Sequence, residues 1–349
     1  MACRSFKSKN ILAAAVVTWS FATALCAMAT GFGSLLAARM AVGIGEAGGT
    51  PPSHSIIGDY FRQSEFARAL SIYSLGPVMG GVLGFAAGGL LADQIGWRAT
   101  LVTLGLPGVV VGALVYFTVR EPRRGRYSSP QQAMTQSSAT WRLLSSNRPF
   151  VGAVIAYTMQ TIIGSIVVSW TATILIRSFE ATKSEAGIML GAGAALGAMP
   201  GTLLGGWLAD KLGAKDRQWM ARVPAIALVV TMPFYLAAMF ATSIIQMVAL
   251  ISLGGLFFSV ATVPAIGIIQ SVVAPGQRAM ASAILLLCAN LFGLGLGPLA
   301  AGGLSDLFEP TLGLRSLNYA VATMSLVLVP AIAAYLWTAR QLKPRIFGS

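Results

Sequence analysis

Charged side chains are scarce in this chain, and their scarcity excludes a water-soluble globular domain. Asp, Glu, Lys and Arg make up 10% of the 349 residues, whereas hydrophobic residues make up 56%. Soluble domains carry about 25% charged residues, so this chain lacks the charge to cover a water-facing surface of its size. We therefore expect an integral membrane protein.

Other chemical groups are also scarce, and each absence removes a class of function. The single histidine leaves no partner for a catalytic dyad, and no His or Cys cluster has the spacing of metal ligands. No stretch resembles the phosphate-binding pattern GxxxxGK[ST]. Cys3, Cys26 and Cys288 form no disulfide framework and are expected to be free thiols. The sequence thus predicts neither an enzyme nor a protein that binds a metal or cofactor.

Long uncharged stretches separate the clustered charges, and they are long enough to cross a membrane. A helix needs about 20 apolar residues to cross the bilayer core, and in lipid its backbone groups must be paired internally. The two longest stretches need turns, near Thr30–Ser34 and Thr242–Ser243. The ten predicted transmembrane helices are residues 11–29, 35–58, 69–91, 99–119, 150–176, 186–208, 222–241, 245–269, 279–301 and 316–337.

The formal net charge of +13 does not indicate nucleic-acid binding, because the basic residues gather on one side of the predicted membrane. Ten spans place nineteen of the 24 Lys and Arg residues on one side and four on the other. Cytoplasmic loops are enriched in Lys and Arg. Both termini and residues 120–148 are therefore expected in the cytoplasm, with the chain in a plasma (inner) membrane. A cleaved secretory signal at residues 1–29 is the alternative interpretation of the first span.

The predicted span at residues 69–91 is repeated in the predicted span at residues 279–301. Gly80 aligns with Gly293 and Gly84 with Gly297, and both copies run in the same direction through the membrane. Parallel repeats of this kind relate the halves of some transporters.

The repeat divides the chain into two pseudo-symmetric halves. We expect an N-terminal half at 1–119 with four spans, a cytoplasmic linker at 120–148, and a C-terminal half at 149–349 with six spans. The first half would then lack its first two helices. Truncation of the sequence and a true ten-helix form both remain open.

Three local motifs resemble the major facilitator superfamily. GGWLADKLGAKDR (205–217) is similar to the signature loop of the family, RMAVGIGEAGG (39–49) to its fourth-helix pattern, and SLGPVMGGVLG (74–84) to the fifth helix of many proton-coupled exporters. Residues 39–76 and 290–320 also resemble the Spinster-like branch, whose members are associated with lysolipid and sphingolipid export.

This resemblance implies an all-α bundle that acts as a secondary transporter by alternating access. Its substrate would be an amphipathic or organic-anion small molecule, with a proton as the coupling ion and a monomer as the working unit. A drug/proton antiporter is the alternative within transport, and a non-transporting truncated remnant or scaffold is the alternative outside it.

Three ionisable residues within one predicted span are candidates for proton coupling or substrate binding. Arg39 and Glu46 lie seven residues apart, about two helical turns, so they share one helix face. His54 follows two prolines near the inner end of the same span, and histidine titrates in the physiological range. A structural ion pair and a packing histidine are the alternatives.

Polar residues in the second half are candidates to line a cavity. The resemblance implies that the first and fourth helices of each half face the cavity. Backbone hydrogen bonding by hydroxyl groups is the alternative role. The candidates are Tyr157, Gln160, Thr161, Ser165, Ser259, Thr262 and Asn290.

A further set of residues is expected to serve conformational change. Charged loop residues can latch one state, and small residues let helices approach closely. Solvated loop charges and plain helix packing are the alternatives. The set comprises Asp210, Lys211, Arg217, Gly76, Pro77, Gly80 and Gly81.

Overall fold

The computed structural model describes residues 8–61, 63–121, 144–273 and 277–342. All secondary-structure elements in this part of the chain are helices, and it contains no strand. Seven helical stretches within it are long and apolar enough to cross a membrane. The chain is thus an all-helical, multi-pass membrane protein. The count of ten spans and the four-plus-six division stay predictions, as does the linker, most of which lies outside the described residues.

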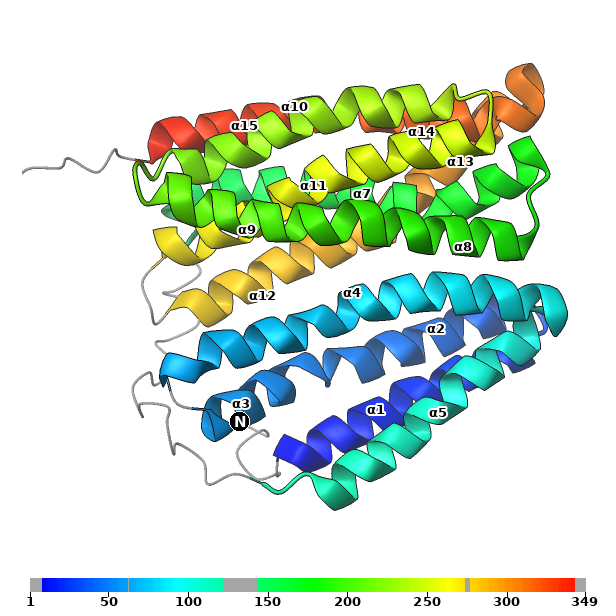
Figure 1. Ribbon diagram of the computed structural model, residues 1–349, viewed down its shortest axis with the longest axis horizontal. Coiled ribbons are helices and arrows are strands. Elements are labelled where there is room, and N and C mark those ends of the chain that lie inside the picture. Colours follow the sequence, from blue (N-terminus) through cyan, green and yellow to red (C-terminus); the bar gives the residue numbers. More distant parts are fainter. Residues whose placement is uncertain (1–7, 62, 122–143, 274–276, 343–349) are drawn as a thin grey trace, which may run out of the picture. The chain divides into compact units, whose positions relative to one another are not determined.

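The chain forms two compact units, Met1–Gln131 with Lys183–Ile188, and Gln132–Thr182 with Met189–Ser349. In the first unit, α1 (Ser8–Leu25) packs against α2 (Phe32–Ala47), α3 (Thr50–Tyr60) and α5 (Gly96–Thr118), and α4 (Gln63–Gln94) packs on α5 (Figure 1). A small core gathers around Ala22, Cys26 and Val42.

The remaining helices belong to the second unit, except for Lys183–Ile188 of α8, which belong to the first (Figure 1). They are α7 (Arg148–Phe179), α8 (Lys183–Gly193), α9 (Met199–Gly213), α10 (Trp219–Met239), α11 (Ile244–Val272), α12 (Arg278–Cys288), α13 (Gly297–Leu312), α14 (Ser316–Ser325) and α15 (Leu328–Gln341). Helix α11 packs on α9 and α10, and α15 packs on α7 and α10. Ile163, Leu228 and Ile268 are fully buried between them.

A helix break lies at each predicted turn. The first is shorter than the predicted Thr30–Ser34, because α2 already begins at Phe32, whereas α11 begins at Ile244, directly after Thr242–Ser243. Ser243 caps α11 by accepting a hydrogen bond from the Gln246 N–H. The thiols of Cys26 and Cys288 are free, as expected, and Cys3 lies outside the described residues.

The single helix predicted for residues 35–58 is wrong. The chain instead forms α2 and α3, separated by a turn at Gly48–Gly49. Pro51 and Pro52 lie in the first turn of α3, and proline supplies no backbone N–H for helical hydrogen bonding. Neither piece reaches the length of a full span, which is one reason that the structure yields fewer candidate spans than the sequence.

Two segments of the second unit are wound as π-helix, which sequence patterns do not predict. Ala194–Ala198 joins α8 to α9, and Ala289–Leu296 joins α12 to α13. Such segments carry an extra residue in the turn and are frequent at functional sites. The second segment packs against α7.

Hydrogen bonds close one end of the first unit. The Glu121 carboxylate accepts the backbone N–H groups of Ser8 at 2.7 Å and Lys9 at 3.0 Å, which would otherwise be unpaired at the start of α1. In return, Lys9 Nζ donates to the carbonyl of Tyr116 at 3.2 Å, near the end of α5. A carboxylate suits the positive end of α1, and an ammonium group suits the negative end of α5.

Large apolar side chains cover the outside of the described helices. Phe32 on α2 is 82% exposed and Phe117 on α5 is 80% exposed. Exposed apolar surface of this extent is typical of a protein whose solvent is lipid.

Candidate functional site

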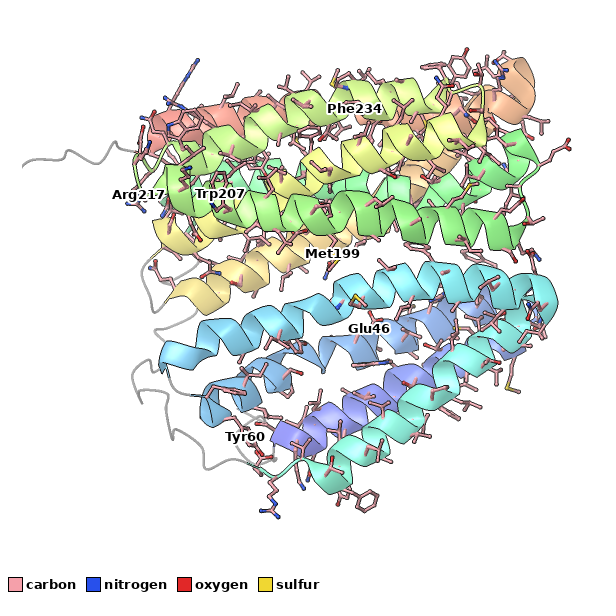
Figure 2. All side chains as sticks on the ribbon, viewed as in Figure 1. Glu46, Tyr60, Met199, Trp207, Arg217 and Phe234 are labelled. Atoms are coloured by element: carbon pink, nitrogen blue, oxygen red, sulfur yellow. The ribbon has the colours of Figure 1, made fainter. Side chains whose placement is uncertain are left out.

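Arg39 and Glu46 both lie exposed on α2, and Figure 2 labels Glu46 near the C-terminal end of that helix. They form no ion pair with each other, which is consistent with the two helical turns between them. The opposite side of α2 packs on α1, where Gly45 lies against Trp19. The packed side and the charged side of α2 are therefore distinct.

His54 lies within α3, but its side chain is outside the described part of the structure. Gly76, Pro77 and Gly80 are exposed on α4, and Gly81 is half-buried there. Among the described residues, nothing lies within 4 Å of a Cβ built on Gly76, Gly80 or Gly81. These glycines make no close helix contact within the described unit.

Gln160 is the centre of a buried polar network in the second unit. Its Nε2 donates to Thr262 Oγ1 at 3.1 Å, and its Oε1 accepts the hydroxyl hydrogen of Tyr335 at 2.7 Å. Tyr335 is fully buried on α15. Tyr335 is not among the residues that the sequence indicates as site candidates, because a tyrosine in an apolar span gives no sign that its hydrogen-bond partner lies on a distant helix.

The remaining polar residues of α7 differ in their hydrogen-bond partners, which lie either within α7 or on another helix. Thr161 Oγ1 donates to the carbonyl of Tyr157 at 2.8 Å, within α7. Ser165 Oγ is 2.6 Å from the carbonyl of Gly293, inside the π-helical segment Ala289–Leu296. Asn290, in the same segment, is exposed.

Ser259 of α11 is half-buried, as is its neighbour Thr262. Their helix also carries Phe258, whose carbonyl accepts a hydrogen bond from Thr262 Oγ1 at 3.1 Å. The structure therefore brings Gln160 and Thr262 together, whereas among the described residues Ser259 and Asn290 make no hydrogen bond to that network.

Trp207 and Arg217 lie at one end of the second unit (Figure 2), and Asp210 and Lys211 belong to the C-terminal part of α9 rather than to the following loop. Arg217 Nη2 donates to the carbonyl of Ser271 at 2.7 Å, near the end of α11. The Lys211 ammonium lies 4.4 Å from the centre of the Trp207 ring, a cation–π contact. Asp210 is exposed beside Lys211.

Comparison with known proteins identifies the family of this chain. The Major Facilitator Superfamily model matches residues 3–238, more than half of the chain. The chain belongs to the major facilitator superfamily. Its membership indicates a transporter of small molecules rather than an enzyme.

Relatives connect this superfamily member to the Spinster-like branch. An MFS-type efflux pump of Mycolicibacterium smegmatis is 30% identical, over 95% of this chain and 77% of the pump. Protein spinster homolog 1 of Xenopus tropicalis is 27% identical, over 96% of this chain and 68% of that protein. The crystal structure of a bacterial homolog of the human lysosomal transporter Spinster, inward-facing and unoccupied, superposes with a TM-score of 0.87 at 27% identity. That match covers 98% of this chain and 85% of the other.

Within the described residues, no group of three or more His, Cys, Asp or Glu side chains could hold a metal ion. Glu46 is the one acidic residue of α2 and stands on its charged side.

Proposed function

We propose that this superfamily member is a secondary active transporter that works by alternating access. It couples the movement of an amphipathic or organic-anion small molecule to protons. The observation that carries this proposal is the exposed pair Arg39 and Glu46 on α2, within an apolar region of the chain. Charged groups are costly in a bilayer and generally mark a substrate or ion pathway.

The two side chains suit different tasks. A carboxylate such as Glu46 takes up and releases a proton, whereas the guanidinium of Arg39 binds an anionic group through several hydrogen bonds. His54 is the next candidate for the proton. In this proposal the protein is a monomer in the plasma (inner) membrane, with both termini in the cytoplasm.

The polar residues of the second unit suit a largely apolar cargo. Tyr157, Thr161, Ser259 and Asn290 offer hydroxyl and amide groups but no fixed charge. A ligand site of this kind is mostly apolar, with a few polar groups that set orientation.

A drug/proton antiporter is the second candidate. The relative at 30% identity is named as an efflux pump. A drug/proton antiporter for apolar cations would exchange them for protons, and in that case Glu46 would meet both the proton and the cationic drug.

Purified protein in proteoliposomes distinguishes the two candidates. With an imposed proton gradient, we expect accumulation of a radiolabelled lysophospholipid that a protonophore abolishes. Gradient-driven movement of a cationic fluorescent dye, without lysophospholipid transport, would favour the antiporter. Movement of neither probe, with correctly folded protein, would contradict the proposal.

A further inference from the structure

The break between α2 and α3 follows directly on Glu46, in the last turn of α2. At this break, the Gly48 N–H donates to the Gly45 carbonyl at 3.1 Å and the Gly49 N–H to the Glu46 carbonyl at 3.0 Å. The Gly49 carbonyl accepts the N–H of Ser53 at 3.3 Å and its hydroxyl at 2.8 Å. Carbonyls on both sides of the break are thus paired.

The carbonyls of Ala47 and Gly48, which lie between these paired carbonyls, lack the N–H donors that a continuous helix would supply. In an α-helix, a carbonyl accepts the N–H group four residues later. For Ala47 and Gly48 these residues are Pro51 and Pro52, which have no N–H. Carbonyls without a helical donor are tolerated at membrane depth where protein or water satisfies them, so these two oxygen atoms need a partner other than the N–H group four residues later.

Packing on α1 holds the break in place. A Cβ on Gly45 would lie 2.7 Å from Trp19 N, and a Cβ on Gly49 would lie 2.7 Å from Trp19 Cζ3. A Cβ on Gly48 would lie 3.1 Å from the Cβ of Ala15. The close contact with α1 therefore requires glycine and fixes one side of the break, while Glu46 and Ala47 stay exposed on the other.

The electrostatics of the exposed side favour a cation. The C-terminal end of a helix carries a partial negative charge, and Glu46 in the last turn of α2 adds a full one. Glu46 is the one acidic residue of α2, and no group of three or more His, Cys, Asp or Glu side chains that could hold a metal ion occurs among the described residues. A single carboxylate charge suits a monovalent ion better than a divalent one. Unwound carbonyls and half-helix ends are the groups that coordinate Na⁺ in broken transporter helices.

We propose that the α2–α3 break is a Na⁺ site, formed by the Glu46 carboxylate with the backbone carbonyls of Ala47 and Gly48. This Na⁺ site rests on the proposed function, in which Glu46 carries the coupling ion. The site deepens that function by adding Na⁺ to the ions that the Glu46 carboxylate holds.

Thermal unfolding of the purified protein in detergent tests Na⁺ binding without any transport step. An ion that binds only the folded state raises the unfolding temperature. We expect NaCl to raise it by about 2 °C or more relative to N-methylglucamine chloride at equal ionic strength.

Three variants locate the response. Glu46→Gln removes the charge, and the double change Pro51→Ala with Pro52→Ala returns N–H donors to the two carbonyls, so both should abolish the Na⁺ response. Pro107→Ala, in α5, is the matched control and should keep it, because α5 carries no carboxylate.

Equal unfolding temperatures in both salts, or a Na⁺ response that survives in Glu46→Gln or in the double proline variant, would overturn the proposal. Because the assay measures binding, a Na⁺ response without proton-driven transport would refute the proposed coupling alone. Proton-driven transport without a Na⁺ response would refute the Na⁺ site alone.

Discussion

The hydroxyl group of Tyr335 donates a hydrogen bond to Gln160 Oε1 at 2.7 Å, across 175 residues of sequence. The bond joins α15 to α7 in the interior of the second unit, and Gln160 Nε2 extends it to Thr262 on α11. Three helices are thus tied at one buried point. Buried polar networks of this kind stabilise a fold when every member is paired.

Removing the Tyr335 hydroxyl should destabilise the second unit. Tyr335→Phe leaves Gln160 Oε1 buried without its donor, which costs about 1–3 kcal/mol. Thermal unfolding should show the loss. Tyr319→Phe is the control, because Tyr319 is 36% exposed and packs edge-on against Phe240. Equal stability of the two variants would show that the bond contributes nothing.

Neutralising Glu46 should uncouple transport from the proton gradient. Glu46→Gln keeps the size of the side chain but cannot release a proton, so gradient-driven accumulation should vanish while counterflow exchange partly survives. Uptake and counterflow in the same proteoliposomes measure both properties. If the variant keeps wild-type gradient-driven transport, proton coupling resides elsewhere, with His54 the next candidate.

Cysteine labelling tests the membrane orientation. In a cysteine-free background, single cysteines at Ser128 and Thr182 should react with an impermeant reagent from opposite sides, because the basic residues assign these positions to different loops. Thr182 should label in intact cells and Ser128 only after the membrane is opened. Labelling of Ser128 from outside would overturn the orientation.

Equivalent glycines of the repeat should differ in their tolerance of alanine. A Cβ on Gly297 would lie 2.8 Å from Ser165 Oγ on α7, whereas nothing described lies within 4 Å of a Cβ on Gly84. Gly297→Ala should therefore lower the unfolding temperature, and Gly84→Ala should leave it unchanged.

We propose that two further helices complete the first half, one of them on the Gly84 face as α7 lies on the Gly297 face. In a chain extended upstream by two spans, Gly84→Ala should then become destabilising as well. If Gly84→Ala stays neutral in the extended chain, the symmetry does not extend to this contact.

Asp93 should stabilise the first unit in a manner that depends on pH. Its carboxylate accepts the Ser184 N–H at 2.6 Å, and the hydrogen bonds from Ser184 lower the pKa of Asp93 below its ordinary value. A lowered pKa in the folded state means that the contribution is present above the ordinary carboxyl pKa and is lost as the pH falls through the lowered one.

Unfolding temperatures of Asp93→Asn and wild type should therefore differ at neutral pH and converge in acid. A difference for Asp93→Asn that is constant with pH would exclude ionisation as its cause.

Much of the fold was predictable, because apolar length and charge placement are local properties of a membrane span. The turns before Phe32 and Ile244 followed from the length that a bilayer permits. The motifs of residues 39–49 and 205–217 were sufficient to indicate the superfamily, which the match over residues 3–238 confirmed.

The single helix predicted for residues 35–58 failed because an absence of charge carries no information on helix continuity. The Gly48–Gly49 pair followed by two prolines was a usable signal of a break, but prolines also occur in continuous membrane helices. Packing against Trp19 settles the conformation, and that contact joins residues far apart in sequence.

By itself, the sequence determined that this protein is a helical membrane transporter of the major facilitator superfamily, because composition, span length and short motifs are all written along the chain. Only the tertiary structure decided that α2 ends beside Glu46 and that Gln160 meets Tyr335. These features depend on which helices become neighbours, and a hydrogen bond across 175 residues leaves no periodic trace in the residues between.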